Sequence, residues 1–179
     1  MHGNAQLHRR GRLIMPESIH YLTGDATDPQ GAGGKIIIHI CNDVGGWAKG
    51  FVLALSKRWK QPEESYRSWY ASQEYFQLGV VQFVPVFDEE DEEAEELWVA
   101  NMIAQHDIIA DQHGNPPLRL DALEKCLRQV AGFAQDHALS VHLPRIGTGL
   151  AGGKWEDIEP LLQQYLSDAG IPTYVYDLP

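Results

Sequence analysis

The sequence has only two cysteines in 179 residues, and Cys41 and Cys126 stand far apart. This spacing excludes a cysteine zinc motif and favours free thiols in a reducing compartment. The eight histidines are equally scattered, and none falls in a paired ligand pattern such as HExxH. We therefore expect no metal site and no bound cofactor.

Long apolar runs are also missing, because no stretch reaches the roughly 18 consecutive apolar residues of a membrane helix. The N-terminal segment contains basic residues but lacks the apolar stretch of a secretion signal. We expect a cytoplasmic protein that does not associate with membranes. Residues 1–16 show no hydrophobic periodicity, so we expect them to be disordered and to precede one folded domain at 17–179.

Positive charge is scarce, with 14 basic against 25 acidic residues and a net charge of −11. This balance argues against a nucleic-acid partner. Eight of the acidic residues lie in one run, "DEEDEEAEE" at 88–96, and without it 17 acidic residues face 14 basic ones, a net charge of −3. Repulsion within the run predicts a solvated loop or insertion between two strands, and an interaction tail is the alternative.

The residues that are present predict an α/β domain. Hydrophobic residues make up 44% of the chain, enough for a full core, and short β-rich runs alternate with longer helical patterns, which is typical of a largely parallel sheet. Strands are expected at 19–22, 35–40, 79–85, 97–103, 141–146 and 173–177. Helices are expected at 48–59, 62–74, 118–137 and 155–168, with Pro160 in about the first turn of the last helix.

Two of the expected strands lead into a glycine-rich turn followed by an amphipathic helix, at "HICNDVGGWAKGF" (39–51) and at "HLPRIGTGLAGGKW" (142–155). Glycine allows a close approach of the backbone, and the amides at a helix start attract anions, so two such turns would suit a diphosphate. The alternative is that the glycines only make tight connections. The second turn satisfies GxGxxG, but too little chain follows for a dinucleotide-binding unit, and neither turn fits a P-loop.

These two stretches, together with "GDAT" at 24–27 and "YVYDL" at 174–178, resemble a macrodomain over residues 19–178. The similarity is to the branch that includes ADP-ribose-1″-phosphate phosphatases and ADP-ribosyl-ester hydrolases. The resemblance implies a three-layer α/β/α fold with a mixed, mostly parallel six-stranded sheet. It also implies a cleft for ADP-ribose at the strand ends.

At the adenosine end, the resemblance implies that Asp25 accepts a hydrogen bond from the adenine amino group and that the amide of Ala26 is a second adenine contact. Tyr176 would stack beside the adenosine. From the residues alone, Asp25 could instead be a turn residue and Tyr176 a half-buried strand residue.

At the other end, the resemblance places Asn42 and Asp43 near the distal ribose and implies two loops around the ligand. The first loop, along the ribose, comprises Gly45, Gly46, Trp47 and Ala48. The second loop, around the diphosphate, comprises Ile146, Gly147, Thr148, Gly149 and Leu150. Trp47 could instead belong to the core, and Arg145 could pair with phosphate or with an acidic residue. A β-branched residue at Gly46 or Gly147 is expected to lower ligand affinity more than stability.

The chemistry is less determined than the binding. Related ester hydrolases have an acidic residue and a lysine where this chain has Ala151 and Gln105, which argues against a lysine-assisted ester mechanism. For a phosphatase, we expect Asp43 to position or activate the attacking water and Asn42 to bind the ribose. His39 could act as acid or base, or be a core histidine.

Two functions remain open. The chain could hydrolyse ADP-ribose-1″-phosphate or a related ADP-ribosyl derivative, or it could be a non-catalytic reader of ADP-ribose. Its partner is expected to be ADP-ribose or an ADP-ribosylated small molecule or protein. Another nucleoside-diphosphate ligand is a third alternative.

Overall fold

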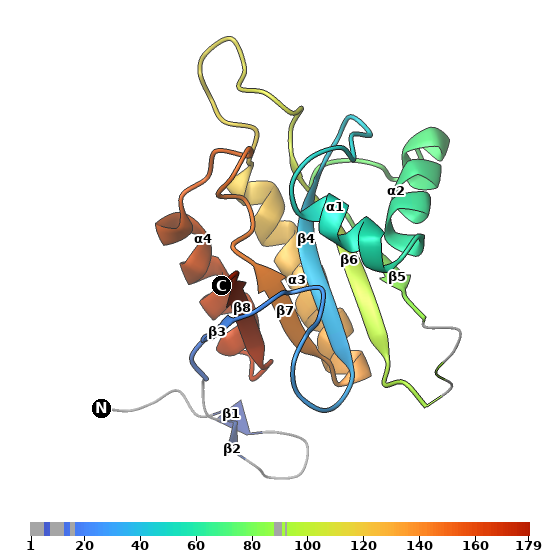
Figure 1. Cartoon of the computed structure of the whole chain (residues 1–179). Helices are drawn as coiled ribbons and strands as arrows, with labels where there is room; N and C mark the ends of the chain where they lie inside the picture. Colours follow the sequence, from blue (N-terminus) through green and yellow to red (C-terminus); the bar gives the residue numbers. More distant parts are fainter. Residues whose placement is uncertain (1–5, 8–12, 15–16, 88–90, 92) are drawn as a thin grey trace.

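The computed structural model describes the chain except for residues 1–5, 8–12, 15–16, 88–90 and 92. Its centre is a six-stranded sheet with the order β3-β8-β7-β4-β6-β5 (Figure 1). The strands are β3 (His20–Thr23), β4 (Lys35–Asn42), β5 (Val81–Pro85), β6 (Leu97–Gln105), β7 (Ser140–Pro144) and β8 (Thr173–Asp177). All neighbouring strands are parallel except β5 and β6, which confirms the mixed, mostly parallel sheet.

Helices cover both faces of this sheet, which confirms the three-layer α/β/α architecture (Figure 1). One face carries α1 (Phe51–Arg58) and α2 (Gln61–Ser72), and the other carries α3 (Leu120–His137) and α4 (Trp155–Leu162). Side chains alternate along β4, so Ile36 and Ile38 join the α3 and α4 core while Ile37 joins the α1 and α2 core. The apolar run "KIIIHI" is thus buried on both faces, as expected of a central strand.

The positions of β4 and β7 decide where a site can form. They are parallel neighbours in the middle of the sheet, with Lys35 opposite Ser140 and Ile37 opposite His142. Parallel strands place their carboxyl ends at the same edge. The two glycine-rich turns, which follow β4 and β7, therefore start side by side at this edge.

Some boundaries differ from those expected. α1 begins at Phe51 rather than at 48, because Gly50 has a φ of +83° that a right-handed helix does not allow. Pro160 lies inside α4 rather than in its first turn. At this interior position it removes one helical hydrogen bond. The chain then continues as a π-helix, η1 (Gln163–Ser167), in place of regular α-helix.

Of the segment 1–16, expected to be disordered, the structure describes β1 (Gln6–Leu7) and β2 (Leu13–Ile14), which pair antiparallel. The rest of that segment lies outside the described residues. The acidic run connects β5 to β6, as expected for a loop between strands. Its described members at 91 and 93–96 are exposed, and Glu95 forms an ion pair with Lys35 at 3.1 Å. No helix in the described part of the chain has both the length and the apolar character needed to cross a membrane.

Candidate functional site

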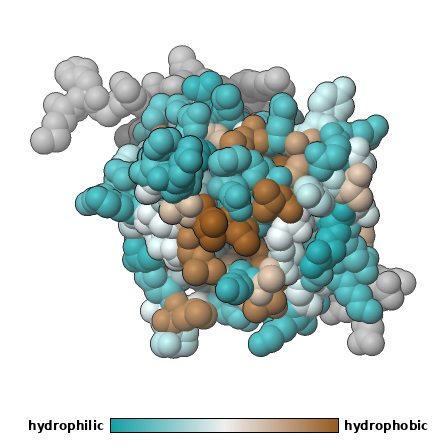
Figure 2. All heavy atoms as spheres, turned by 90° about the horizontal axis from the view of Figure 1, so that it is seen from above, coloured by the Kyte–Doolittle hydropathy of each residue, from teal (hydrophilic) through white to brown (hydrophobic). Residues whose placement is uncertain are grey.

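A cavity of about 320 Å³ lies between the two glycine-rich turns at the carboxyl edge of the sheet. One wall is formed by residues 49–52, where α1 begins, and the opposite wall by residues 144–151, which follow β7. Between them the cavity is lined by His39, Ile40 and Gln105 from the central strands. The face at this edge carries a group of apolar side chains near its middle (Figure 2). The second turn and the end of the first turn therefore border one cavity.

Unpaired backbone amides give this cavity its binding chemistry. In the second loop, the amides of residues 147–151 donate to no acceptor in the described part of the chain. On the opposite wall, the first turn of α1 begins after Gly50, which supplies no side-chain cap for the helix amides. Free amides and the positive end of a helix dipole favour anions, so both walls are suited to phosphate.

The charges around the cavity point the same way. None of the described residues that line it is Asp or Glu, although the chain has 25 acidic residues. The lining does include two cations, Lys49 and Arg145. Arg145 is held by both carboxylate oxygens of Asp177, at 2.6 and 2.9 Å, which is the structural pairing considered as an alternative. A locally positive cavity in an acidic protein indicates an anionic ligand.

Gly147 and Gly149 of the second loop differ in the space that a Cβ atom would have. Gly147 has a φ of +74°, and a Cβ on it would lie 3.1 Å from Ile158 and 3.2 Å from Ile40. Valine there would also disturb the core, so stability is expected to fall together with affinity at this position. Gly149 has no atom within 4 Å of its Cβ position and no positive φ. Of these two glycines, only Gly149 borders open space.

Asn42 shapes the first loop from within. Its Oδ1 accepts hydrogen bonds from the amides of Val44 (3.1 Å) and Gly46 (2.9 Å), and its Nδ2 donates to the Gly46 carbonyl (3.0 Å). The amide group is thus engaged in the loop rather than directed to a ribose. A Cβ on Gly46 would lie 2.9 Å from Nδ2 of Asn42, so valine at Gly46 would break this arrangement too.

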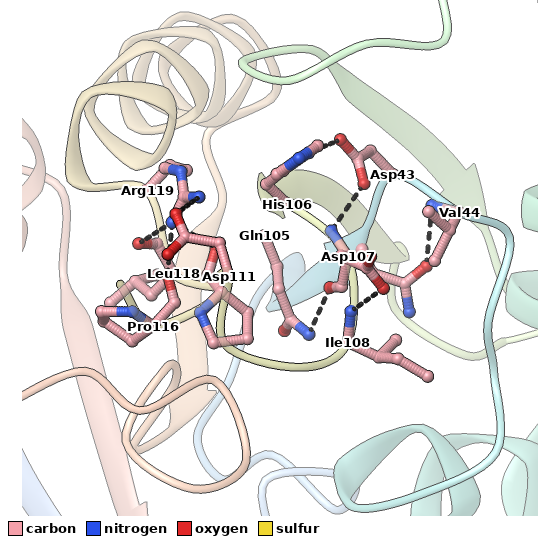
Figure 3. Close-up of polar contacts among 12 residues, drawn as sticks. Asp43, Val44, Gln105, His106, Asp107, Ile108, Asp111, Pro116, Leu118 and Arg119 are labelled. Atoms are coloured by element: carbon pink, nitrogen blue, oxygen red, sulfur yellow. Dashed lines mark hydrogen bonds and ion pairs between the residues drawn. The ribbon is translucent and has the colours of Figure 1, made fainter. Parts of the chain in front are cut away.

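Asp43 contacts the loop after β6 (Figure 3). Its Oδ2 lies 2.7 Å from Nδ1 of His106, and its Oδ1 accepts a hydrogen bond from the Asp107 amide at 2.8 Å. Asp43 is largely covered, with 17% of its side chain exposed, whereas His106 is 54% exposed. Sequence patterns did not separate His106 from an ordinary loop histidine, because its partner is 63 positions away.

His39 is a core histidine, which corrects its assignment as an acid or base. It is 2% exposed and packs against Trp47, with ring centroids 5.3 Å apart. Asn101 uses its amide nitrogen on other acceptors, so its oxygen, 2.5 Å from Nε2 of His39, accepts the proton of that nitrogen. Burial lowers the pKa of His39 to about 4, and the ring is neutral at pH 7.

Trp47 also belongs to the core, the second of the alternatives stated for it. It is 4% exposed, joins the cluster between β4, α1 and α2, and donates from Nε1 to the hydroxyl of Ser56 at 2.9 Å. It does not line the cavity.

The adenosine end differs in part from expectation. Asp25 is exposed, and its Oδ1 accepts hydrogen bonds from the amide and the hydroxyl of Thr27, both at 2.8 Å, which is the turn role considered as an alternative. Tyr176 is only 3% exposed. Its hydroxyl accepts from the amide of Gln30 and lies 2.8 Å from Nδ1 of His142, so little of the ring is left for stacking.

The expected residues therefore divide into two groups. Those that line the cavity are His39, Ile146, Gly147, Thr148, Gly149 and Leu150. Those outside the lining are Asp25, Ala26, Asn42, Asp43, Gly45, Gly46, Trp47, Ala48 and Tyr176. The hydroxyl of Thr148 donates to the carbonyl of Arg145 at 2.8 Å, so it is already used. Residues 49–52 line the cavity but were not among the expected site residues, although a helix start after Gly50 could have indicated them.

Comparison with known proteins supports the fold and the family. A structure of a protein of unknown function from Bacteroides thetaiotaomicron is 57% identical, with a TM-score of 0.85 over 90% of this chain and 98% of that one. The structure of a macrodomain protein from Streptomyces coelicolor is 48% identical, with a TM-score of 0.75 over 89% and 99% of the two chains. No protein-family model matches the chain.

Curated relatives are more distant or much longer. The chromodomain-helicase-DNA-binding protein 1-like of Mus musculus is 34% identical over 164 residues, which cover 90% of this chain but 18% of the relative's length. The ADP-ribose 1″-phosphate phosphatase of Candida glabrata is 24% identical over 182 residues, covering 90% of this chain and 99% of the phosphatase.

The alignment with the Streptomyces coelicolor protein covers 89% of this chain and 99% of that one, and 48% of the aligned residues are identical. The six-stranded sheet and the helices on both of its faces agree with the fold that the macrodomain resemblance implied. The chain belongs to the macrodomain family.

Proposed function

We propose that this chain binds ADP-ribose, with the pyrophosphate between the two loops, and that it hydrolyses ADP-ribose-1″-phosphate or a related ADP-ribosyl derivative. The observation that carries the binding is the pairing of unbonded amides at 147–151 with the uncapped start of α1 across one cavity. The curated phosphatase from Candida glabrata supports the choice of ligand.

Hydrolysis of the terminal phosphate needs a water molecule and a group that accepts its proton. The water oxygen bonds to phosphorus, the bond from phosphorus to the ribose oxygen breaks, and the ribose oxygen takes up a proton. The products are ADP-ribose and inorganic phosphate.

We assign the proton acceptor to His106, with Asp43 as its positioning residue. The backbone amide of Asp43 donates to the carbonyl of Gln105 at 3.0 Å, and Gln105 is one of the residues that line the cavity, so Asp43 lies next to a lining residue. Asp43 holds Nδ1 of the ring, and Nε2 makes no hydrogen bond within the described part of the chain. The remaining imidazole near the cavity, His39, is buried and hydrogen-bonded in the core.

One experiment separates turnover from binding. Purified protein is incubated with ADP-ribose-1″-phosphate, free phosphate is measured, and the affinity for ADP-ribose is determined by calorimetry. Phosphate release that disappears in His106→Gln but persists in His113→Gln, a second exposed loop histidine, supports the proposal. Absence of ADP-ribose binding by the unaltered protein would refute it.

A non-catalytic reader is the second candidate, and a specific observation favours it. No carboxylate lines the cavity among the described residues. The macrodomain resemblance implies an acidic residue and a lysine in related ester hydrolases where this chain has Ala151 and Gln105. Tight ADP-ribose binding with no phosphate release, and with no release of ADP-ribose from modified protein, would establish this reading.

A further inference from the structure

The connection from β3 to β4, residues 24–34, passes across β7 and β8 (Figure 1). His142 of β7 lies opposite Ile37 of β4, so it shares the sheet face on which Ile37 packs against α1 and α2. Under the connection this face carries buried polar side chains: His142 is fully buried, and Tyr176 of β8 is 3% exposed. Buried polar groups require hydrogen-bond partners, and these two find theirs in each other and in the connection.

The protons of this buried group have one consistent arrangement. The Gln30 amide donates to the hydroxyl oxygen of Tyr176 at 2.8 Å, and Nδ1 of His142 lies 2.8 Å from the same oxygen. Burial and the charge of Lys35 lower the pKa of His142 to about 4, so the ring is neutral at pH 7. Nδ1 then accepts the hydroxyl proton of Tyr176, while Nε2 donates to the hydroxyl of Ser140 at 2.8 Å. The other tautomer would leave the Tyr176 proton without an acceptor in the described part of the chain.

Tyr176 contacts the connection at two points. Its ring lies against Gly24, on which a Cβ would be 3.5 Å from Cδ1 of the ring, and its hydroxyl holds the amide of Gln30. Among the described hydrogen bonds, this amide is the one amide of residues 25–33 that donates to a strand. Just beyond it, Gly31 and Gly33 have positive φ and no atom within 4 Å of a Cβ position. The chain there has few restraints of its own, so the contact with Tyr176 decides where the segment 24–30 lies.

The segment 24–30 begins beside the cavity. The carboxylate of Asp177 accepts hydrogen bonds from Arg145 of the cavity lining at 2.6 and 2.9 Å. The backbone carbonyl of Asp177 accepts from the Gly24 amide at 2.8 Å. The residues that follow Gly24, including Asp25 and Ala26 of the expected adenosine end, therefore leave the sheet next to the cavity lining.

We propose that Tyr176 and His142 are positioning residues for ligand binding. Tyr176 holds the segment 24–30 through its hydroxyl, and His142 orients that hydroxyl so that its oxygen faces the amide of Gln30. This inference rests on the proposed function, because it places the adenosine of ADP-ribose against the segment 24–30. It assigns the effect of Tyr176 to the hydroxyl and not to stacking by the ring. A stacking residue tolerates phenylalanine, whereas a residue that holds an amide through its hydroxyl does not.

Tyr176→Phe removes the hydroxyl and keeps the ring, and Tyr174→Phe is its matched control. Tyr174 lies on the same strand and stacks on His142 with ring centroids 5.0 Å apart, and its hydroxyl makes no hydrogen bond in the described part of the chain. Amide exchange, followed by NMR without ligand, measures the hold on the segment 24–30 directly. Exchange at Gln30 should be about tenfold faster in Tyr176→Phe and unchanged in Tyr174→Phe. The Gly24 amide, bonded to a backbone carbonyl, is the internal reference and should exchange at one rate in all three proteins.

Calorimetry then links the segment to binding. Tyr176→Phe should lower the affinity for ADP-ribose about tenfold, and Tyr174→Phe should leave it unchanged. His142→Asn supplies an amide oxygen that can replace Nδ1 as the acceptor, whereas His142→Leu supplies none. The asparagine variant should therefore keep slower exchange at Gln30 and higher affinity than the leucine variant. If the leucine variant does not fold, the comparison of Tyr176→Phe with Tyr174→Phe still decides.

The outcomes separate this inference from the function on which it rests. Unchanged exchange at Gln30 in Tyr176→Phe would overturn the inference, as would faster exchange with unchanged affinity for ADP-ribose. In both cases ADP-ribose binding by the unaltered protein would leave the proposed function standing. Failure of the unaltered protein to bind ADP-ribose would remove the proposed function and, with it, this role of Tyr176 and His142.

Discussion

Substitution of Gly149 by valine tests the site most directly, because the structure predicts loss of binding without loss of stability. The Cβ of residue 149 would have no protein atom within 4 Å, and its backbone is outside the left-handed region. The added carbons would instead enter the cavity beside the free amides. A substitution at an exposed position of this kind changes the free energy of unfolding by about 0.5 kcal/mol or less.

Ligand affinity should respond far more strongly. Hydrogen bonds from amides to a charged phosphate contribute about 1.5–3 kcal/mol each. If the valine displaces the diphosphate from even one amide, the affinity for ADP-ribose falls by about tenfold to hundredfold. Gly149→Ala, which adds a single carbon, should give a smaller loss in the same direction.

Gly147 is the matched comparison in the same loop. Its φ of +74° costs an L-residue about 1–2 kcal/mol, and contacts at 3.1–3.2 Å with Ile158, Ile40 and Leu118 add overpacking of about 1–3 kcal/mol. Gly147→Ala should therefore lower the free energy of unfolding by about 2–5 kcal/mol, and Tm by about 4–20 °C.

The assay is thermal unfolding without ligand, followed by calorimetric titration with ADP-ribose for each variant. Gly149→Val should keep its Tm and lose affinity, whereas Gly147→Ala should lose Tm. Wild-type affinity in Gly149→Val would refute the placement of the ligand at the second loop. A Tm loss in Gly149→Val equal to that of Gly147→Ala would refute the packing argument.

Three further predictions concern other parts of the molecule. His106→Gln should lower kcat for phosphate release about a hundredfold, as for loss of a general base, with ADP-ribose affinity retained; unchanged kcat would exclude the role. Asp25→Asn keeps an acceptor for Thr27 but replaces the other oxygen with a donor, so it should favour the inosine analogue over ADP-ribose in a competition assay, and an unchanged ratio would contradict the adenine contact. The folded state lowers the pKa of His39 to about 4, from an unfolded value of about 6.5. The contribution of the neutral ring to the free energy of unfolding is therefore fully present above about pH 6.5 and is lost as pH falls toward about 4. Between about pH 7 and pH 5 the free energy of unfolding should fall by about 2 kcal/mol. Urea unfolding at both pH values checks this, and a His39→Gln variant with an equally steep pH dependence would disprove it.

Much of the fold followed from the sequence by itself. Strand β8 occupies the expected residues, and the apolar run of β4 was correctly expected to be buried on both faces, because local periodicity and β-branched composition determine such elements. The two glycine-rich turns were recognisable for the same reason, since glycine, strand and helix patterns are all local. The order of the motifs was enough to indicate the family.

The contacts that each polar residue makes were decided only by the tertiary structure. Asn42 and Asp43 look like ligand residues in the sequence, yet one holds Gly46 and the other holds His106, a partner 63 positions away. Trp47 and Tyr176 became buried because α2 and the loop before β4 cover them. The strand order brought the turns after β4 and β7 together as neighbours, and only that adjacency made two local glycine-rich patterns border a single cavity.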